Sequence, residues 1–268
     1  MLFFDIFIKI CYNIYIKKKE REVINMAVYC CTDLHGRYDL FQAIKKFLKP
    51  EDIMYFLGDA NDRGPDGWKL VKAILSEPNW IYIKGNHEEM LHKAMQEFLS
   101  QDDWDMPNYR HLVENGGYKT FEDWMQEEER FKREWLSLLR KLPLYKTYTN
   151  DHGLSFLLTH SGCTPIATEN NGYSFENSSP ELLWNRKHFI DIWDEKLETL
   201  VVVHGHTPNC FIDEAIHPEV KDKGVELGAY WYADCHKVCL DTGAVWTDTT
   251  VLLNLDTLEE EIIQIEEK

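Results

Sequence analysis

The sequence has few basic residues for its length. Its 268 residues include 29 lysines and arginines against 46 aspartates and glutamates, which gives a formal net charge of −17 at pH 7. A surface of that sign repels the phosphates of nucleic acids. Nucleic acid is therefore not expected as a partner of this chain.

The sequence also lacks Cys-x-x-Cys pairs. It has seven cysteines, and two of them, Cys30 and Cys31, are neighbours inside an apolar run that is typical of a buried strand. Thiols in such surroundings are usually free and reduced. We expect free, buried thiols in a reducing cytoplasm and no disulfides.

A long apolar run is absent. Residues 1–16 are rich in Phe, Ile and Tyr, but Asp5, Lys9 and Asn13 interrupt them, so the stretch is too short and too polar for a membrane-spanning helix. A signal peptide fits poorly, because no basic region precedes the apolar stretch and no small-residue cleavage site follows it. We expect residues 1–25 to be an extension outside the fold, as an upstream start codon would produce. A helix lying on a membrane surface is the alternative.

No internal repeat, low-complexity tract or clear linker divides the rest of the chain. With 44% apolar residues, the chain has enough material for a sizeable core. Residues 26–268 are therefore predicted to form a single catalytic domain.

Apolar periodicity predicts an α/β fold. Strands are expected at 27–31, 53–57 and 80–83, with helices at 38–48 and 68–75 between them, which is a βαβαβ unit. Residues 86–142 are helical in pattern and densely charged, with a break at Gly116-Gly117, and are expected to form a helical cap. After Pro143, strands are expected at 154–158, 200–203, 238–240 and 251–255. Strands in both halves with helices outside them indicate two packed sheets flanked by helices.

Five short polar clusters follow apolar runs in a fixed order. They are Asp33-Leu34-His35-Gly36, Gly58-Asp59-Ala60-Asn61-Asp62-Arg63-Gly64, Gly85-Asn86-His87-Glu88, His160-Ser161-Gly162 and His204-Gly205-His206-Thr207. Ligands collect at the carboxyl ends of parallel strands, where the first three clusters stand. Carboxylates, imidazoles and an amide suit divalent metal ions, and the clusters offer too many ligands for one ion.

In this order the clusters resemble the phosphoprotein phosphatase (PPP) family of metal-dependent serine/threonine phosphatases, in its small bacterial and phage branch, within the calcineurin-like metallophosphoesterase superfamily. The resemblance extends from about residue 27 to about residue 257. It implies a four-layer α/β/β/α sandwich with a helical cap.

The resemblance also implies a ligand set for two metal ions. Asp33 and His35 would bind the first ion and Asp59 would bridge both, while Asn86, His160 and His206 would complete the second site. His204 is expected to be a neighbouring polar group rather than a ligand. Pro208 stands where the wider superfamily has a further histidine, and this favours the PPP branch. Ligation by nitrogen and oxygen without thiolate favours Mn, Fe or Zn over Mg or Ca, and the resemblance favours Mn.

Four further residues are candidates for catalysis. His87, whose ordinary pKa is near 6.5, is hypothesised to protonate the leaving alkoxide, with Asp62 holding its imidazole in the required tautomer. Arg63 and Arg186 are proposed to clamp the phosphate, because a guanidinium can give two hydrogen bonds to phosphoryl oxygens. The expected reaction is direct attack by a metal-bridging hydroxide, without a covalent intermediate.

The expected substrate is the phosphoserine or phosphothreonine of a protein, which makes the chain a serine/threonine protein phosphatase. The alternative is a symmetrical diadenosine tetraphosphatase, whose core motifs are alike, with cap residues around 102–115 choosing the substrate. A non-catalytic binding module on the same fold is a third reading. Asp241-Thr242-Gly243 resembles a segment that closes the core near the site, and we expect no direct catalytic role for it. Trp184, Trp231 and Trp246 are predicted to pack in the core.

Overall fold

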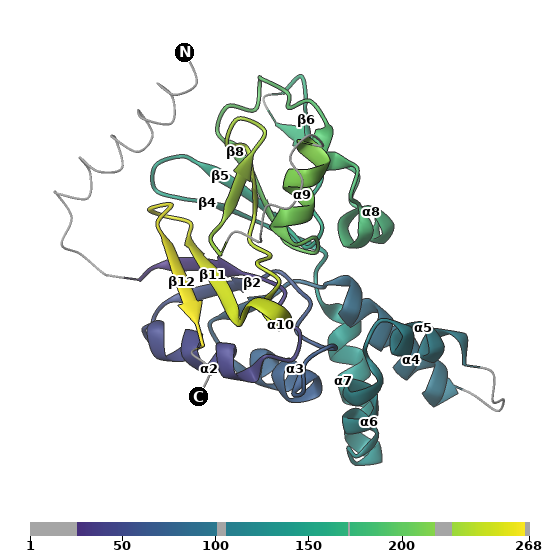
Figure 1. Ribbon diagram of the computed structural model, residues 1–268. Helices are drawn as coiled ribbons and strands as arrows, with labels where there is room; N and C mark the ends of the chain where they lie inside the picture. The colour runs from purple at the N-terminus through teal and green to yellow at the C-terminus, as the bar shows by residue number, and fades with distance from the viewer. Residues whose placement is uncertain (1–25, 101–105, 171, 218–226, 266–268) are drawn as a thin grey trace.

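The computed structural model describes residues 26–100, 106–170, 172–217 and 227–265 (Figure 1). The predicted extension at 1–25 lies outside the described residues, and so do Cys11 and residues 102–105 of the segment expected to choose the substrate. Cys30, Cys31, Cys163 and Cys239 are buried free thiols, as predicted, whereas Cys210 and Cys235 are partly exposed.

Within the described ranges, five strands form the first sheet in the order β12-β11-β1-β2-β3. Strands β1 (Val28–Cys31), β2 (Ile53–Phe56) and β3 (Trp80–Tyr82) are parallel, and helices α2 (Tyr38–Phe47) and α3 (Gly67–Ser76) connect them. The predicted βαβαβ unit is therefore confirmed. Strands β11 (Thr249–Asn254) and β12 (Glu260–Gln264) continue the sheet in antiparallel pairing beyond β1.

The second sheet has the order β4-β5-β8-β10-β9. Its centre is parallel, with β5 (Ser155–Thr159) beside β8 (Leu200–His204) and β8 beside β10 (Lys237–Cys239). Antiparallel strands close its two edges, β4 (Tyr145–Thr149) on one side and β9 (Tyr230–Tyr232) on the other. The short strands β6 (Ile166–Ala167) and β7 (Tyr173–Ser174) pair only with each other.

The layers follow from the alternation of side chains along each strand. Cys30 and Leu57 of the first sheet share a buried cluster with Phe156 and Val203 of the second, so the two sheets pack face to face. The next residue along β1, Cys31, faces the opposite way and packs with Leu40 and Phe41 of α2.

On the far side of the second sheet, Leu157 and Val202 pack with Leu182 of α8 (Ser179–Trp184). The 3₁₀ helix η1 (His188–Ile190) and helix α9 (Asn209–Ile216) lie in the same outer layer, because Phe189 and Ile212 pack together against Cys239. The order is thus helix, sheet, sheet, helix, which confirms the predicted four-layer sandwich. A further short helix, α10 (Ala244–Thr247), precedes β11.

A group of helices leaves the sandwich after β3. It comprises α4 (Asn86–Ser100), α5 (Pro107–Glu114), α6 (Tyr118–Met125) and α7 (Glu129–Lys141), which gather at one end of the first sheet, at the lower right of Figure 1. The predicted break at Gly116-Gly117 separates α5 from α6, and Gly116 has a left-handed φ of 89° that suits glycine. Among the described residues, none of the helices is long and apolar enough to span a bilayer.

Candidate metal centre

The predicted site residues stand at the carboxyl ends of parallel strands from both sheets. Asp33 and His35 follow β1, Asp59 follows β2, and Asn86 begins α4 after β3. From the second sheet, His160 follows β5 and His206 follows β8. The side chains of all six are buried. The structure brings them together, although the sequence separates Asp33 from His206 by 173 positions.

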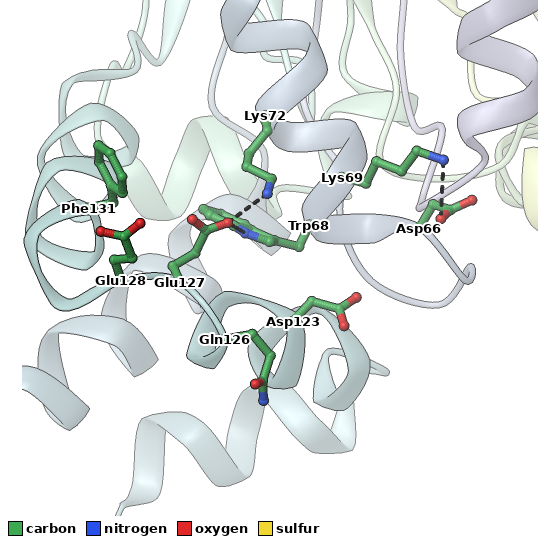
Figure 2. Close-up of a pocket in the computed structure, with 9 residues that line it drawn as sticks. All are labelled: Asp66, Trp68, Lys69, Lys72, Asp123, Gln126, Glu127, Glu128 and Phe131. Atoms are coloured by element: carbon green, nitrogen blue, oxygen red, sulfur yellow. Dashed lines mark hydrogen bonds and ion pairs between the residues drawn. The ribbon is translucent and has the colours of Figure 1, made fainter.

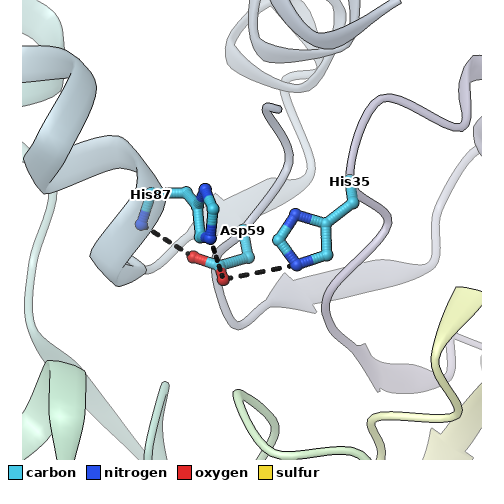
Figure 3. A group of neighbouring side chains, drawn as sticks. All are labelled: His35, Asp59 and His87. Atoms are coloured by element: carbon cyan, nitrogen blue, oxygen red, sulfur yellow. Dashed lines mark hydrogen bonds and ion pairs between the residues drawn. The ribbon is translucent and has the colours of Figure 1, made fainter. Parts of the chain in front are cut away.

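One carboxylate, that of Asp59, lies between two groups of potential ligands. Its Oδ2 is 3.5 Å from Nε2 of His35 and 3.8 Å from Nε2 of His87 (Figure 3). Its Oδ1 is 3.4 Å from Nε2 of His160, and His206 completes that second group. Each oxygen of Asp59 therefore faces a different group, which is the arrangement that a carboxylate bridging two ions requires.

Asp33 and Asn86 extend these groups. Asp33 Oδ1 is 3.8 Å from Nε2 of His35, on the side of the first group. Asn86 Oδ1 is 2.8 Å from Nε2 of His160 and 2.9 Å from Nδ1 of His206, within the second group. Neighbouring ligands on one ion at about 2.1 Å are themselves about 3.0–3.4 Å apart, so these separations are close to those of a ligand set.

Two further observations test whether a cation fits here. Among the described residues, Oδ1 of Asp33 is buried and has no hydrogen-bond partner, although a buried carboxylate oxygen is costly to leave unpaired. Nδ1 of His160 donates to the carbonyl of Leu57, so Nε2 presents a lone pair toward the acceptor Oδ1 of Asn86. Two acceptors that face each other call for a positive charge between them, and the residues therefore fit divalent metal ions.

Two of the imidazoles are held in the tautomer that leaves Nε2 without a proton. Nδ1 of His35 donates to the carbonyl of Asn61 over 3.0 Å, so Nε2 presents a lone pair on the side of Asp59. His160 is held in the same way by Leu57. Such second partners fix both the ring orientation and the nitrogen that can bind.

Burial governs the protonation of the site. Burial raises the pKa of Asp33 and raises that of Asp59 well above its ordinary value, and the nearby charges of Asp33 and Glu88 raise the pKa of Asp59 further. Burial also lowers the pKa of His35 and of His206 well below the usual value of 6.5. The site thus disfavours net negative charge on Asp33 and Asp59 and keeps the imidazoles of His35 and His206 neutral, and neutral imidazole is the form that binds metals.

His87 and Asp62 form the predicted pair. Nδ1 of His87 donates to Oδ2 of Asp62 over 2.7 Å, and both side chains are fully buried. Burial lowers the pKa of His87 well below 6.5 and raises that of Asp62 to about 7, because neither charged form is solvated there. Nε2 of His87 faces Oδ2 of Asp59, so the geometry admits His87 as a ligand as well as an acid.

Both predicted arginines reach the cluster from its solvent-exposed side. Arg63 donates from Nη1 to Nε2 of His35 over 2.7 Å and from Nη2 to Nε2 of His87 over 3.0 Å. Arg186 donates from Nε to Nε2 of His206 over 3.3 Å. The two guanidinium groups therefore lie where a phosphate arriving from solvent would meet them.

The loops that carry the ligands are held in left-handed backbone conformations. Among the ten candidate residues, six have a positive φ, between 40° and 70°, namely Asp33, His35, Asp59, Asp62, Arg63 and His206. Glycine is required where the loops meet, because a Cβ on Gly205 would lie 2.1 Å from Oδ2 of Asp33. Strain of this kind is typical of functional sites.

Glu88 is a residue of the site to which the sequence analysis assigns no role. Its carboxylate is fully buried and accepts four hydrogen bonds, from the backbone N–H groups of Asp59, Ala60 and Gly85 and from the hydroxyl of Tyr82, over 2.7–2.9 Å. It therefore ties the loop of Asp59 to the loop of Asn86. The position of Glu88 in the sequence could have indicated this role, since a carboxylate in the first turn of a helix often accepts hydrogen bonds from backbone N–H groups.

The prediction that three tryptophans pack in the core is wrong for two of them. Trp184 is 40% exposed and Trp246 is 54% exposed, while Trp231 is half-buried. Trp184 ends α8, so its ring lies beyond the buried pair Leu182 and Leu183 and reaches the edge of the metal centre. Its ring centroid is 6.1 Å from that of His206.

The expectation that none of the seven cysteines stands in the Cys-x5-Arg pattern of cysteine-dependent phosphatases is wrong, because Cys31 and Arg37 have this spacing. Cys31 is fully buried on β1, and burial raises the pKa of its thiol. Arg37 is engaged in ion pairs with Asp39 and Asp248. These two residues therefore form no phosphate-binding loop around a reactive thiol.

A surface pocket lies away from the cluster, between α3 and the α6–α7 turn (Figure 2). None of the ten candidate residues lines it. Its lysines are paired, Lys72 with Glu127 at 2.6 Å and Lys69 with Asp66 at 3.6 Å. The pocket therefore lacks the free ligands that the metal centre offers.

Residues 26–236 match the family model of calcineurin-like phosphoesterases, and they contain all ten candidate residues. The chain belongs to this family. Its His and Asp groups are arranged so that they could hold divalent metal ions.

Two curated relatives differ in their named activity. The symmetrical bis(5′-nucleosyl)-tetraphosphatase of Delftia acidovorans is 26% identical over 144 residues, which is 52% of this chain and 46% of that protein. Serine/threonine-protein phosphatase 2 of Escherichia coli is 27% identical over 164 residues, which is 59% of this chain and 66% of that protein. The matched part thus spans between about half and two thirds of these relatives.

A solved structure shares the fold. A protein serine/threonine phosphatase from Saccharomyces cerevisiae superimposes with a TM-score of 0.55 at 16% identity, covering 97% of this chain and 89% of that one. At this identity the likeness supports the sandwich fold alone.

Proposed function

We propose that this phosphoesterase is of the PPP type and removes phosphate from phosphoserine and phosphothreonine of proteins at a centre of two divalent ions. The observation that carries the proposal is the position of Asp59, whose two carboxylate oxygens each face one group of ligands. Asp33, His35 and Asp59 would hold the first ion, and Asp59, Asn86, His160 and His206 the second. Manganese is the proposed metal, with iron or zinc as alternatives, and the free thiols support the predicted cytoplasmic location.

When bound, the two ions would supply an activated water and polarise the phosphoryl group. Arg63 and Arg186 would bind the outer phosphoryl oxygens, because both guanidinium groups lie at the exposed side of the cluster. His87 would give a proton to the departing serine or threonine oxygen from Nε2, which would have to take up that proton first, and Asp62 would keep the imidazole oriented through Nδ1. Burial of the candidate metal ligands and of His87 keeps bulk water away from them.

Purified protein loaded with Mn²⁺ would test this function. Phosphate release should be compared for a phosphoserine peptide, a phosphotyrosine peptide and diadenosine tetraphosphate, with Asp59→Asn as the control that loses the bridging carboxylate. We expect turnover of the phosphoserine peptide by the wild type and none by the variant. Absence of hydrolysis with metal still bound would support a binding module instead.

A second candidate is hydrolysis of a dinucleoside polyphosphate. It is favoured by the exposed Trp184 beside His206 and by the named activity of the Delftia relative. A clear preference for diadenosine tetraphosphate in the same comparison would place this candidate first.

A further inference from the structure

An exposed aromatic ring stands at the rim of the metal centre. The indole of Trp184 is 40% exposed, and it meets the ring of His206 nearly at right angles, with an interplanar angle of 81°. Two positions further on, Arg186 contacts the same histidine through Nε. Trp184 and a phosphate-binding arginine are thus presented by one short segment on the same side of the centre.

A second ring approaches from the cap. His111 of α5 is exposed, and its ring centroid is 6.2 Å from that of Trp184, with an interplanar angle of 35°. The two rings come from different layers, Trp184 from α8 behind the second sheet and His111 from the helices beyond the first. They make a continuous aromatic surface next to the ligand set.

We propose that Trp184 and His111 form an aromatic subsite on which the nucleobase of a substrate stacks while its phosphate is bound at the metal centre. The inference rests on the second candidate function given above and names its recognition element. Stacking suits this surface, because an aromatic face accepts any base and an adjacent arginine binds the phosphate.

The position of Trp184 favours a base over an aromatic ring joined directly to the phosphate. The ring of His206 lies between the indole and the oxygen of Asn86. A phenyl ring on the phosphoryl oxygen would therefore lie over the ligands, short of Trp184. In a symmetrically cleaved dinucleoside tetraphosphate, a base is held away from the attacked phosphate by a ribose and the α-phosphate, and this spacer lets it reach the rim.

A matched pair of non-hydrolysable probes isolates the base. The 5′-(α,β-methylene)diphosphates of adenosine and of ribose differ only in adenine, and their affinities for the Mn²⁺-loaded protein can be measured by calorimetry without turnover. We expect the wild type to bind the adenosine probe roughly ten-fold more tightly. Trp184→Ala should remove most of this ratio, Trp184→Phe should keep part of it, and His111→Ala should lower it.

Trp231→Ala is the matched control, since Trp231 lies on the edge strand β9, where its Nε1 donates to Glu260. It should keep both the affinity ratio and the activity, and thermal melting would verify that each variant is folded. An unchanged affinity ratio in both Trp184 variants would overturn the proposal. It would also be overturned if Trp184→Ala weakened the binding of phenyl phosphonate as much as it weakened the binding of the adenosine probe. Failure of the proposed function would be separate, because it would appear as a wild type that binds the probes but hydrolyses no ester.

Discussion

His87 is the residue whose role the geometry leaves between two chemistries. Its Nδ1 is committed to Asp62, and its Nε2 faces Asp59 and Arg63. A proton donor and a metal ligand would both use Nε2. Measuring turnover and metal content separately in a His87 variant distinguishes the two roles.

For His87→Asn we expect turnover to fall by roughly 10²–10⁴-fold, the usual contribution of a general acid, with both ions retained. Activity and metal content of the same preparation would be measured, the latter by elemental analysis. Asp62→Asn should slow turnover in the same direction, because the imidazole loses its orienting partner. Loss of one ion from His87→Asn would reassign His87 as a ligand.

A second substitution tests the hydrogen bonds that Glu88 accepts. In Glu88→Gln an amide NH₂ replaces one carboxylate oxygen and would face two N–H donors, or one N–H and the hydroxyl of Tyr82. Each buried donor left without a partner costs about 1–3 kcal/mol, so the free energy of unfolding should fall and Mn²⁺ affinity should weaken as Asp59 shifts.

Glu128→Gln is the control for Glu88→Gln. Glu128 is exposed and pairs with the exposed Arg130, and loss of such a surface pair costs at most about 1 kcal/mol. Urea unfolding of both variants would compare them. Equal stability of the two would contradict the role given to Glu88.

At the scale of elements, the turn between α5 and α6 supports the loop of Asp62 and Arg63. The hydroxyl of Thr120 accepts from the backbone N–H of Asp62 over 3.1 Å, and the carbonyl of Gly116 accepts from the N–H of Arg63 over 3.0 Å. The cap thus holds Arg63, a candidate for phosphate binding, in place although it supplies neither of the two predicted arginines.

Thr120→Val keeps the shape of this buried side chain and removes its oxygen. We expect the N–H of Asp62 to lose its partner, stability to fall by about 1–3 kcal/mol, and KM for the phosphate ester to rise, with metal content unchanged. Thr149→Val on the exposed strand β4 is the matched control. Wild-type KM in a folded Thr120→Val would show that the cap does not position Arg63.

The elements, and the gathering of the candidate ligands at strand ends, could be predicted from sequence, because periodicity and short motifs are local. Strand and helix positions agree within about two residues, as for β5, which begins at Ser155 instead of residue 154. The position of Glu88 in the first turn of α4 indicated an acceptor of N–H groups, but its particular donors could not be predicted, since they come from β3 and from two loops that only the fold joins. The exposure of Trp184 could not be predicted from sequence either. A tryptophan after Leu182-Leu183 has the pattern of a core residue, and its surroundings depend on where α8 ends.

At the scale of the whole molecule, a buried histidine makes stability depend on pH. His188 of η1 is fully buried, and its Nε2 donates to the carbonyl of Ser161. Burial lowers its pKa well below 6.5, and the neighbouring His204 and Lys237 add to the effect. The unfolded chain therefore binds a proton more readily than the folded one, so this contribution to stability is present above about pH 6.5 and is lost as the pH falls below it.

We expect the free energy of unfolding to decrease below pH 6.5, with His188 contributing at most about 1.4 kcal/mol per pH unit. His188→Gln, whose amide can still donate to Ser161, should flatten this dependence, whereas His152→Gln in a surface loop should not. Urea unfolding between pH 5 and pH 7.5 would measure the difference. Parallel curves for the wild type and His188→Gln would refute the assignment.

Removal of metal should also change the stability of the whole molecule. Ions that bind only the folded chain stabilise it by about 2.7 kcal/mol at a hundred-fold excess over Kd. Mn²⁺ should therefore raise Tm, a chelator should lower it again, and Asp59→Asn should abolish most of the shift. A Tm of the wild type that does not respond to Mn²⁺ would argue against the centre.

The left-handed backbone conformations at the site lower the stability of the fold but place residues that the proposed activity needs. A non-glycine residue in this conformation costs about 1–3 kcal/mol, and Asp33, Asp59 and His206 each adopt it. Glycine at these positions would relieve the backbone and delete a ligand. Selection of this chain for thermal stability alone would therefore favour variants that are more stable but have lost candidate metal ligands. Directed evolution should screen for turnover in every round.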